Sequence, residues 1–175
     1  MPIDSTKEFK PINISVLTIS DTRTEATDKS GQILAKKIKE KGHGLSHRQI
    51  VKDDKDDIKK ILLEWCNDKN VDVILTTGGT GLTGRDTTPE ALEEIKDKDI
   101  PGFGELFRLI SYKKIGASTI QSRAMAVLAK GTYVFALPGS SGAVTDAWED
   151  ILKFQLDSRF RPCNFIELIP RLNEQ

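Results

Sequence analysis

The chain carries two kinds of apolar pattern, one typical of strands and the other typical of helices. Runs rich in β-branched and other apolar residues occupy 12–19, 71–75 and 133–137. Such runs predict strands that are buried on both faces, as in the centre of a parallel sheet. Residues 45–51 alternate apolar and polar side chains more strongly, which predicts a half-exposed edge strand.

Apolar residues recur at helical spacing in the segments between these strands. The first helix is predicted over 30–41 and ends at Gly42, because glycine readily takes the left-handed conformation found after helix ends. The second is predicted from apolar residues at i, i+3, i+4 and i+7, namely Ile58, Ile61, Leu62 and Trp65. Pro89 is expected to open a third helix, with Thr87 and Glu90 at capping-box spacing.

Three further apolar stripes predict helices in the second half of the chain. They are formed by Phe103, Leu106, Phe107 and Ile110, by Ala124, Val127 and Leu128, and by Val144, Ala147, Trp148, Ile151 and Leu152. Gly131 is expected to close the middle one. Strands that alternate with helices predict an α/β fold with three layers, α/β/α, around a mostly parallel sheet. We divide the chain into an N-terminal extension (1–11), one domain (12–156) and a C-terminal tail (157–175).

The expected order of the strands indicates where a ligand would bind. With the edge strand outermost, the sheet begins 2-1-3, so the direction of winding reverses between the first and third strands. In open α/β sheets, ligands bind beyond the carboxyl ends of the strands at such a reversal. The sequence therefore predicts a binding site in the segments that follow these strands.

Polar, glycine-rich segments follow three of the predicted strands. They are 20–23 with the helix start at 28–31, 76–81 with 84–89, and 137–142. Glycines let backbone N–H groups approach an anion, and helix N-termini favour negative charge. The candidate ligand contacts are Ser20, Asp21, Ser30, Gly31, Thr77, Gly78, Gly79, Thr80, Gly81, Pro138, Gly139, Ser140 and Ser141. The alternative is that each segment is only a turn between a strand and a helix.

Two carboxylates fall near this expected cradle. Asp53 follows the second strand, and Asp86 lies in the loop after the third. Two carboxylates beside ligand phosphates suit Mg²⁺, which prefers a few carboxylates, waters and phosphate oxygens. The alternatives are that Asp53 caps its helix and that Asp86 holds its loop through an Asx turn.

Composition and motifs exclude several other classes of protein. The formal net charge is zero, so nothing indicates general binding to nucleic acid or to an anionic membrane. There is no apolar run of signal-peptide or membrane-spanning type, and the two cysteines form no CxxC pair, so a cytoplasmic protein is expected. His43 and His47 stand four residues apart, but glycines flank His43, and a metal pair on one helix face is not expected.

Two nucleotide-binding motifs also fail. Residues 79–84 spell GxGxxG, but they follow the third strand and do not lead straight into a helix, which argues against a dinucleotide fold. Gly84 is followed by Arg85 and not by the lysine of a phosphate-binding P-loop. No nucleophile with a neighbouring base emerges either, so chemistry by positioning phosphates remains the simplest activity.

The combination of motifs resembles the MoaB/MogA family of molybdenum cofactor biosynthesis proteins. Its signature is similar to residues 76–81 followed by 86–89, and further landmarks are 101–105, Ser122-Arg123 and 137–140. The resemblance extends over about 12–156. Segments 115–123 and 156–165 are similar to the bacterial MoaB branch.

The resemblance implies a three-layer molybdopterin-binding fold and a trimer, or a hexamer built from trimers. For MogA-like members it implies Mg²⁺- and ATP-dependent adenylylation of molybdopterin, with Asp53 and Asp86 as essential aspartates. The pterin would lie against the 137–140 turn and the helix start at Ser30. The nucleotide would use the 78–81 loop and the 101–105 segment, which adds Gly102, Gly104 and Glu105 to the candidate contacts.

Two hypotheses about function stay open at this point. One is a molybdopterin adenylyltransferase, and the other is a non-catalytic molybdopterin-binding or carrier protein of the same pathway, with other proteins of that pathway as possible partners. An oligomer is also expected from the tail, because its apolar side chains have no evident partner in the core: Phe160, Phe165, Leu168 and Ile169.

Overall fold

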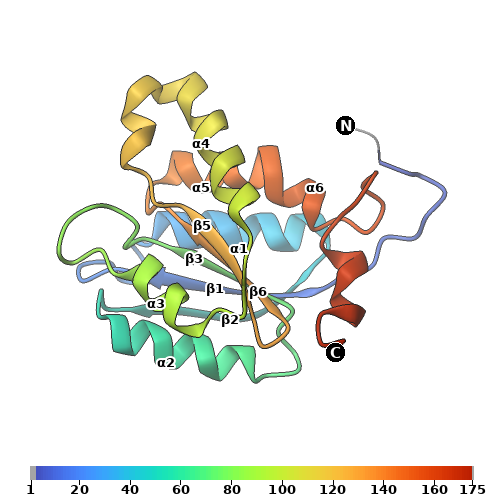
Figure 1. Cartoon of the computed structure of the whole chain (residues 1–175), viewed down its shortest axis with the longest axis horizontal. Helices are drawn as coiled ribbons and strands as arrows, with labels where there is room; N and C mark the ends of the chain where they lie inside the picture. The colour runs from blue at the N-terminus through green and yellow to red at the C-terminus, as the bar shows by residue number, and fades with distance from the viewer. Residues whose placement is uncertain (1–2, 175) are drawn as a thin grey trace.

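The computed structural model describes residues 3–174 and shows three layers, with helices on both faces of a six-stranded sheet (Figure 1). The sheet order is β2-β1-β3-β6-β5-β4. Strands β2, β1, β3 and β6 are parallel, whereas β5 runs antiparallel to both of its neighbours. The predicted fold class and the predicted 2-1-3 start of the sheet are confirmed.

The burial of each strand follows from its place in the sheet. Strands β1 (Asn13–Ile19), β3 (Val73–Thr77) and β6 (Thr132–Leu137) are buried almost throughout, because helices cover both of their faces. Strand β2 (Gly44–Val51) is half-exposed along its length. The continuous apolar runs therefore occupy the centre of the sheet and the alternating segment occupies its edge, as predicted.

The helices divide between the two faces of the sheet. Helices α1 (Lys29–Lys41), α4 (Pro101–Ile115) and α5 (Ser141–Ala147) pack over one face and share one apolar core with it. Helices α2 (Lys55–Cys66) and α3 (Thr88–Ile95) cover the other face and enclose a second core. Each core holds the apolar side chains of one face of the sheet.

Three predictions about where helices begin and end can be compared with the structure. Gly42 ends α1 with a φ of 94°, as expected for a left-handed C-terminal residue. The last predicted helix is continuous in space, because α5 runs on through a π-helical turn (Trp148–Leu152) into α6 (Lys153–Gln155). The predicted capping box at α3 does not form, since the Thr87 side chain makes no cap hydrogen bond.

The helix predicted around Ala124, Val127 and Leu128 is wrong, because this segment is strand β5 (Met125–Ala129). Ala129 pairs with Thr132, so Lys130 and Gly131 form a two-residue hairpin turn, with φ values of 49° and 80°. Gly131 therefore closes a hairpin and not a helix. A five-residue segment buried on both faces shows no period, so its sequence could not tell a strand from a helix.

A short strand, β4 (Lys98–Asp99), pairs with β5 and completes the far edge of the sheet. Its two residues are both exposed, so they carry no apolar pattern that could have predicted a strand. A 3-10 turn, Gly116–Gln121, leads from α4 toward β5.

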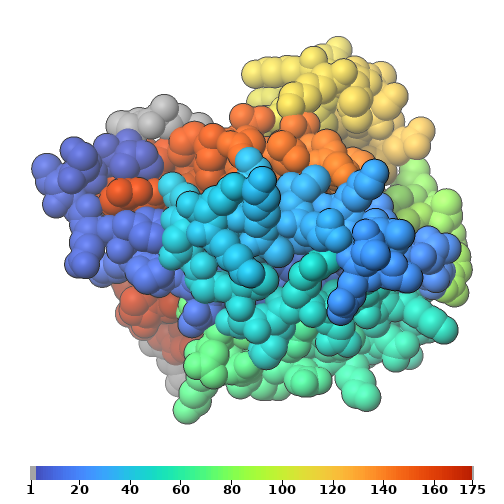
Figure 2. All heavy atoms as spheres, turned by 180° about the vertical axis from the view of Figure 1, so that it is seen from behind, coloured from blue at the N-terminus to red at the C-terminus, as the bar shows by residue number. Residues whose placement is uncertain are grey.

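The C-terminal tail packs on its own domain, one of the two arrangements expected for it, but Leu168 remains exposed. Phe160 is buried, and Phe165 and Ile169 pack against the core beside the final 3-10 turn, Ile166–Arg171. Large exposed apolar side chains gather instead on α4 and the turn after it, which project from the body of the molecule (Figure 2): Leu106, Leu109, Tyr112, Ile115 and Ile120. An oligomer stays a prediction.

Candidate functional site

The loops after β1 and β3 and the turn after β6 meet at one edge of the sheet, at the left of Figure 1. They form one side of an open cleft of about 570 Å³, and Phe107, Ser111 and Ile115 of α4 form the other. The loop and turn residues that line it are Ser20, Thr22, Arg23, Gly78, Gly79, Thr80, Gly81, Asp86, Pro138, Gly139 and Ser140. The sheet topology thus brings all three predicted segments to one cleft.

The loop after β3 can take its shape only with glycine at two positions. Gly78 and Gly79 have φ values of 110° and 62°, which L-residues with a side chain rarely adopt. A Cβ at Gly78 would lie 2.2 Å from the carbonyl oxygen of Ile19, and one at Gly79 would lie 2.3 Å from Thr88 Oγ1. The Thr88 hydroxyl donates to the Gly78 carbonyl at 2.9 Å, which fixes the loop on the start of α3.

Asp53 lies beneath this glycine loop. Its Oδ1 would be 2.8 Å from a Cβ at Gly79, yet this buried oxygen has no hydrogen-bond partner. Burial raises the pKa of the Asp53 carboxyl, the carboxylates of Asp86 and Asp21 raise it further, and the nearby backbone N–H of Thr87 lowers it. An unsatisfied buried carboxylate oxygen is costly, so Asp53 is poised to gain a proton or a cation.

The alternative in which Asp53 caps α2 is wrong. The cap is its neighbour Asp54, whose side chain accepts hydrogen bonds from the N–H groups of Asp56 and Asp57 at 3.0 and 3.1 Å. The N–H of Asp53 itself donates to Asp21 Oδ1 at 3.2 Å. The capping function is filled without Asp53, so its buried Oδ1 needs another explanation.

Asp86 is more fully engaged. Its Oδ2 accepts from the N–H and the hydroxyl of Thr83 at 2.9 and 2.6 Å, and the Thr83 hydroxyl makes the largest contribution to lowering the pKa of Asp86. These hydrogen bonds hold the loop, but they come from a residue three positions earlier and therefore do not form the predicted Asx turn. Asp86 nevertheless lines the cleft, so its carboxylate serves the loop and also faces the ligand space.

Arg123 holds the outer part of the loop in place. Its Nε donates to the Gly81 carbonyl and its Nη2 to the Asp86 carbonyl, both at 2.7 Å, and its Nη1 pairs with Glu90. One guanidinium therefore joins the glycine loop to α3. Arg123 stood in one of the sequence landmarks, but its function could not be read from its position in the chain.

Asp53 and Asp86 provide two carboxylates that fit a cation shared with ligand phosphates. Within residues 3–174, no three histidine, cysteine, aspartate or glutamate side chains converge as a metal-binding group. Thr87 Oγ1 is a second buried oxygen without a partner beside Asp53. These donors suit a hard cation such as Mg²⁺, whose remaining ligands would be water and phosphate oxygens.

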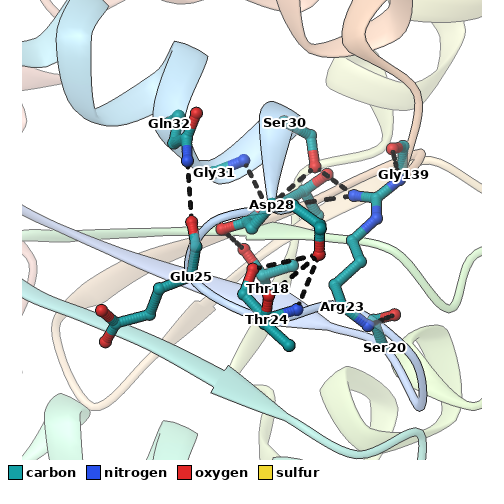
Figure 3. Close-up of polar contacts among 12 residues, drawn as sticks. Thr18, Ser20, Arg23, Thr24, Glu25, Asp28, Ser30, Gly31, Gln32 and Gly139 are labelled. Carbon is teal, nitrogen blue, oxygen red and sulfur yellow. Dashed lines mark hydrogen bonds and ion pairs between the residues drawn. The ribbon is translucent and has the colours of Figure 1, made fainter.

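A second polar cluster lies on the α1 side of the cleft (Figure 3). Asp28 is fully buried, caps α1, and accepts hydrogen bonds from Thr18 Oγ1, the Gly31 N–H and Arg48 Nη2, each at 2.9 Å. Burial alone would raise its pKa, but these partners together hold the pKa of Asp28 below its ordinary value. The cluster is therefore ionised and internally satisfied.

Arg23 connects this cluster to the cleft. Its Nη1 donates to Ser30 Oγ at 2.6 Å and lies 3.9 Å from Asp28 Oδ1, while its Nη2 donates to the Gly139 carbonyl at 2.7 Å. Arg23 lies in one of the predicted segments but is not among the predicted contacts. A lone arginine after a strand carries no spacing that distinguishes it from any other surface arginine.

The predicted contacts divide into those that reach the cleft and those that do not. Nine of them line it: Ser20, Gly78, Gly79, Thr80, Gly81, Asp86, Pro138, Gly139 and Ser140. Ser30, Gly31 and Thr77 are buried in the supporting structure, and Ser141 and Asp21 lie outside the lining, the latter paired with Arg85 at 2.7 Å. Gly104 and Glu105 line a separate hollow beside β5, and Gly102 lines neither.

Another hollow of similar volume, about 540 Å³, lies between the N-terminal segment and the final 3-10 turn. None of the predicted contacts lines it, so we place the site in the cleft at the carboxyl ends of the strands. No helix within residues 3–174 combines the length and the apolar character needed to span a bilayer.

Comparisons with known proteins identify the family of the chain. Residues 15–158 match the family described as "Probable molybdopterin binding domain". Over 158 residues the chain is 47% identical to molybdenum cofactor biosynthesis protein B of Escherichia coli K12, covering 90% of this chain and 93% of that protein.

Two crystal structures extend the likeness to three dimensions. One is of a molybdenum cofactor biosynthesis protein B, with a TM-score of 0.86, 44% identity, and coverage of 97% of this chain and 100% of that one. The other is of the tungsten cofactor synthesizing protein MoaB from Pyrococcus furiosus, with a TM-score of 0.74, 36% identity, and coverage of 82% and 91%. A family match over most of the chain and close relatives over nearly its full length agree, and the chain belongs to the molybdopterin-binding domain family that includes molybdenum cofactor biosynthesis protein B.

Proposed function

We propose that this protein acts in molybdenum cofactor biosynthesis, binds molybdopterin in the cleft, and catalyses its Mg²⁺- and ATP-dependent adenylylation. The observation that carries the catalytic part is the buried, unpartnered Oδ1 of Asp53 beneath the glycine loop. A carboxylate whose burial is not offset by a partner is costly, and such costs collect at functional sites.

In the proposed reaction, an oxygen of the pterin phosphate attacks the α-phosphorus of ATP. A new P–O bond forms, the bond from the α-phosphorus to the bridging oxygen breaks, and pyrophosphate leaves with the electron pair. The chain's own contribution is to position the two phosphates: the glycine loop admits them close to backbone, and Arg123 keeps that loop rigid. Bound Mg²⁺, held by Asp53 and Asp86, would neutralise the charge that develops on the phosphate oxygens.

A second candidate, a non-catalytic molybdopterin-binding or carrier protein, is favoured by one observation. Asp86 already has both hydrogen bonds from Thr83, so its carboxylate is explained without a metal ion. In that case the cleft would bind the pterin without turnover, and substitution of Asp53 would change the affinity for the pterin little.

Pyrophosphate release from ATP on addition of molybdopterin distinguishes the two candidates. We expect release by the wild type, and a loss of at least about a hundredfold in Asp53→Asn, because the amide cannot supply the negative charge that Mg²⁺ requires. Asp54→Asn is the matched control, since asparagine caps a helix about as well as aspartate. Retained turnover in Asp53→Asn would refute the two-carboxylate site, and molybdopterin binding without pyrophosphate release in the wild type would establish the carrier.

A further inference from the structure

The cleft has two chemically different walls, one acidic and one cationic. Asp53, Asp86 and the start of α3 lie on the side of the sheet covered by α2 and α3. Arg23, Ser30 and Gly139 lie on the side covered by α1 and α5. Of these two carboxylates Asp86 lines the cleft, and Asp53 adds a second negative charge behind the glycine loop without lining it. An anion on this side therefore needs a cation to offset the negative charge, whereas an anion on the other side does not.

Among the described residues that line the cleft, Arg23 is the one with a positive charge. Its partner Asp28 does not cancel that charge, because Asp28 also pairs with Arg48 at 2.9 Å and lies farther from Arg23, at 3.9 Å. Two guanidinium groups and one carboxylate leave one net positive charge. Arg48 reaches Asp28 from the edge strand β2 and does not line the cleft, so the excess charge is presented through Arg23.

The guanidinium of Arg23 is held in one position. It donates to Ser30 Oγ at the start of α1 and to the Gly139 carbonyl after β6, and so spans from the end of β1 across to the end of β6 (Figure 3). A fixed, planar guanidinium loses little conformational freedom when it binds an oxyanion. Ser140, which lines the same wall, accepts a hydrogen bond from the Ala143 N–H, and its own hydroxyl hydrogen remains available for a ligand.

We propose that Arg23 and the Ser140 hydroxyl form a metal-independent subsite for a phosphomonoester, separate from the metal-dependent acidic wall. The ligand class is a phosphate ester dianion, and Arg23 contacts it directly. In the proposed adenylylation this group is the attacking phosphate of the pterin, an identification that rests on the proposed function. Phosphate binding itself needs no turnover, so it can be tested even if the protein proves not to be an adenylyltransferase.

The test uses inorganic orthophosphate as the probe and follows it by phosphorus NMR titration of the full chain in EDTA. We expect the wild type to bind orthophosphate equally well with EDTA or with Mg²⁺, and Arg23→Gln to bind it at least tenfold more weakly. Arg48→Gln is the matched control: it removes the other arginine from the same Asp28, and its orthophosphate affinity should stay within twofold of the wild type. Asp53→Asn should bind at least as tightly as the wild type.

Several outcomes would overturn the subsite. They are undiminished binding in Arg23→Gln, an equal loss in Arg48→Gln, or orthophosphate binding by the wild type that requires Mg²⁺. A loss of Mg-ATP affinity in Arg23→Gln with orthophosphate affinity unchanged would also overturn it, because Arg23 would then serve the nucleotide. If Arg23→Gln does not fold, Arg23→Lys decides: weaker binding than the wild type supports the subsite, whereas wild-type affinity, or the same loss in Arg48→Lys, refutes it.

Discussion

The two sides of the cleft differ in whether a buried carboxylate oxygen has hydrogen-bond partners. On the α1 side, the carboxylate of Asp28 has four polar neighbours, and every one of them is part of this chain. On the α3 side, one carboxylate oxygen of Asp53 is just as inaccessible to water but has no partner in the chain. Both groups are aspartates in the segments that connect strands to helices.

The difference separates structural from functional aspartates. A buried carboxylate that is fully hydrogen-bonded stabilises the fold, and it leaves nothing for a ligand to complete. A buried carboxylate with an unpaired oxygen costs stability until something binds to it. We therefore expect substitution of Asp28 to act mainly on stability, and substitution of Asp53 to act mainly on function.

The largest effect on stability is expected for Asp28→Ala. This change leaves Arg23 and Arg48 without their shared carboxylate and removes the cap of α1, and breaking a buried ion pair costs about 3–5 kcal/mol. For a domain of this size, that corresponds to a Tm lowered by roughly 10 °C in a thermal melt. A Tm close to that of the wild type would contradict the view that this cluster is structural.

A smaller loss is expected for Gly79→Ala in the glycine loop. The new Cβ would meet Thr88 Oγ1 at 2.3 Å and Asp53 Oδ1 at 2.8 Å at a φ of 62°, so a cost of about 1–3 kcal/mol is expected. Gly84→Ala is the control in the same loop, because no atom lies within 4 Å of its Cβ and its φ is not positive. Denaturant unfolding should show Gly84→Ala unchanged or slightly more stable. Equal losses in both variants would mean that the loop does not depend on the conformation of Gly79.

The two aspartates should also give the protein opposite responses to pH. The pKa of Asp28 is lowered in the folded state, so its stabilisation is present above the ordinary value of 3.8 and is lost as the pH falls through the lowered pKa. The pKa of Asp53 is raised, so stability declines as the pH rises from 3.8 through the raised pKa. Between pH 3 and 7, the Tm of Asp28→Asn should lie below that of the wild type. The Tm of Asp53→Asn should equal that of the wild type or exceed it by a few degrees, roughly the gain expected when a strained functional residue is replaced. Both differences should shrink toward the acidic end, and differences of the same sign would refute the contrast.

The smallest effect is expected at the rim. Asp21 and Arg85 form an exposed ion pair, and such pairs contribute little to stability. Asparagine at position 21 keeps an oxygen that can accept from the Asp53 N–H. The Tm of Asp21→Asn should therefore equal that of the wild type at low and at high salt. A salt-dependent drop in Tm would show that this pair holds the two loops together.

Much of the fold could be predicted because its signals are local. The central strands β1, β3 and β6 are buried on both faces, and this requires continuous apolar runs that are visible in the chain. Amphipathic helices and the glycine after α1 follow from equally local rules. Strand β5 could not be predicted in this way, because its five mostly buried residues show no period and the glycine of its hairpin turn is also typical of a helix end.

The sequence by itself determined which segments meet at the carboxyl edge of the sheet, because the strand order follows from burial and handedness and the segments follow the strands. Only the tertiary structure decided the function of each polar residue there. Asp53 and Asp54 are adjacent in sequence, yet Asp54 caps a helix in solvent, whereas Asp53 turns one carboxylate oxygen into a buried position beneath a glycine loop. Arg23 acquires its significance from Gly139, which lies 116 residues away in the chain. The environment of a charge is set by atoms distant in sequence, and no local pattern records them.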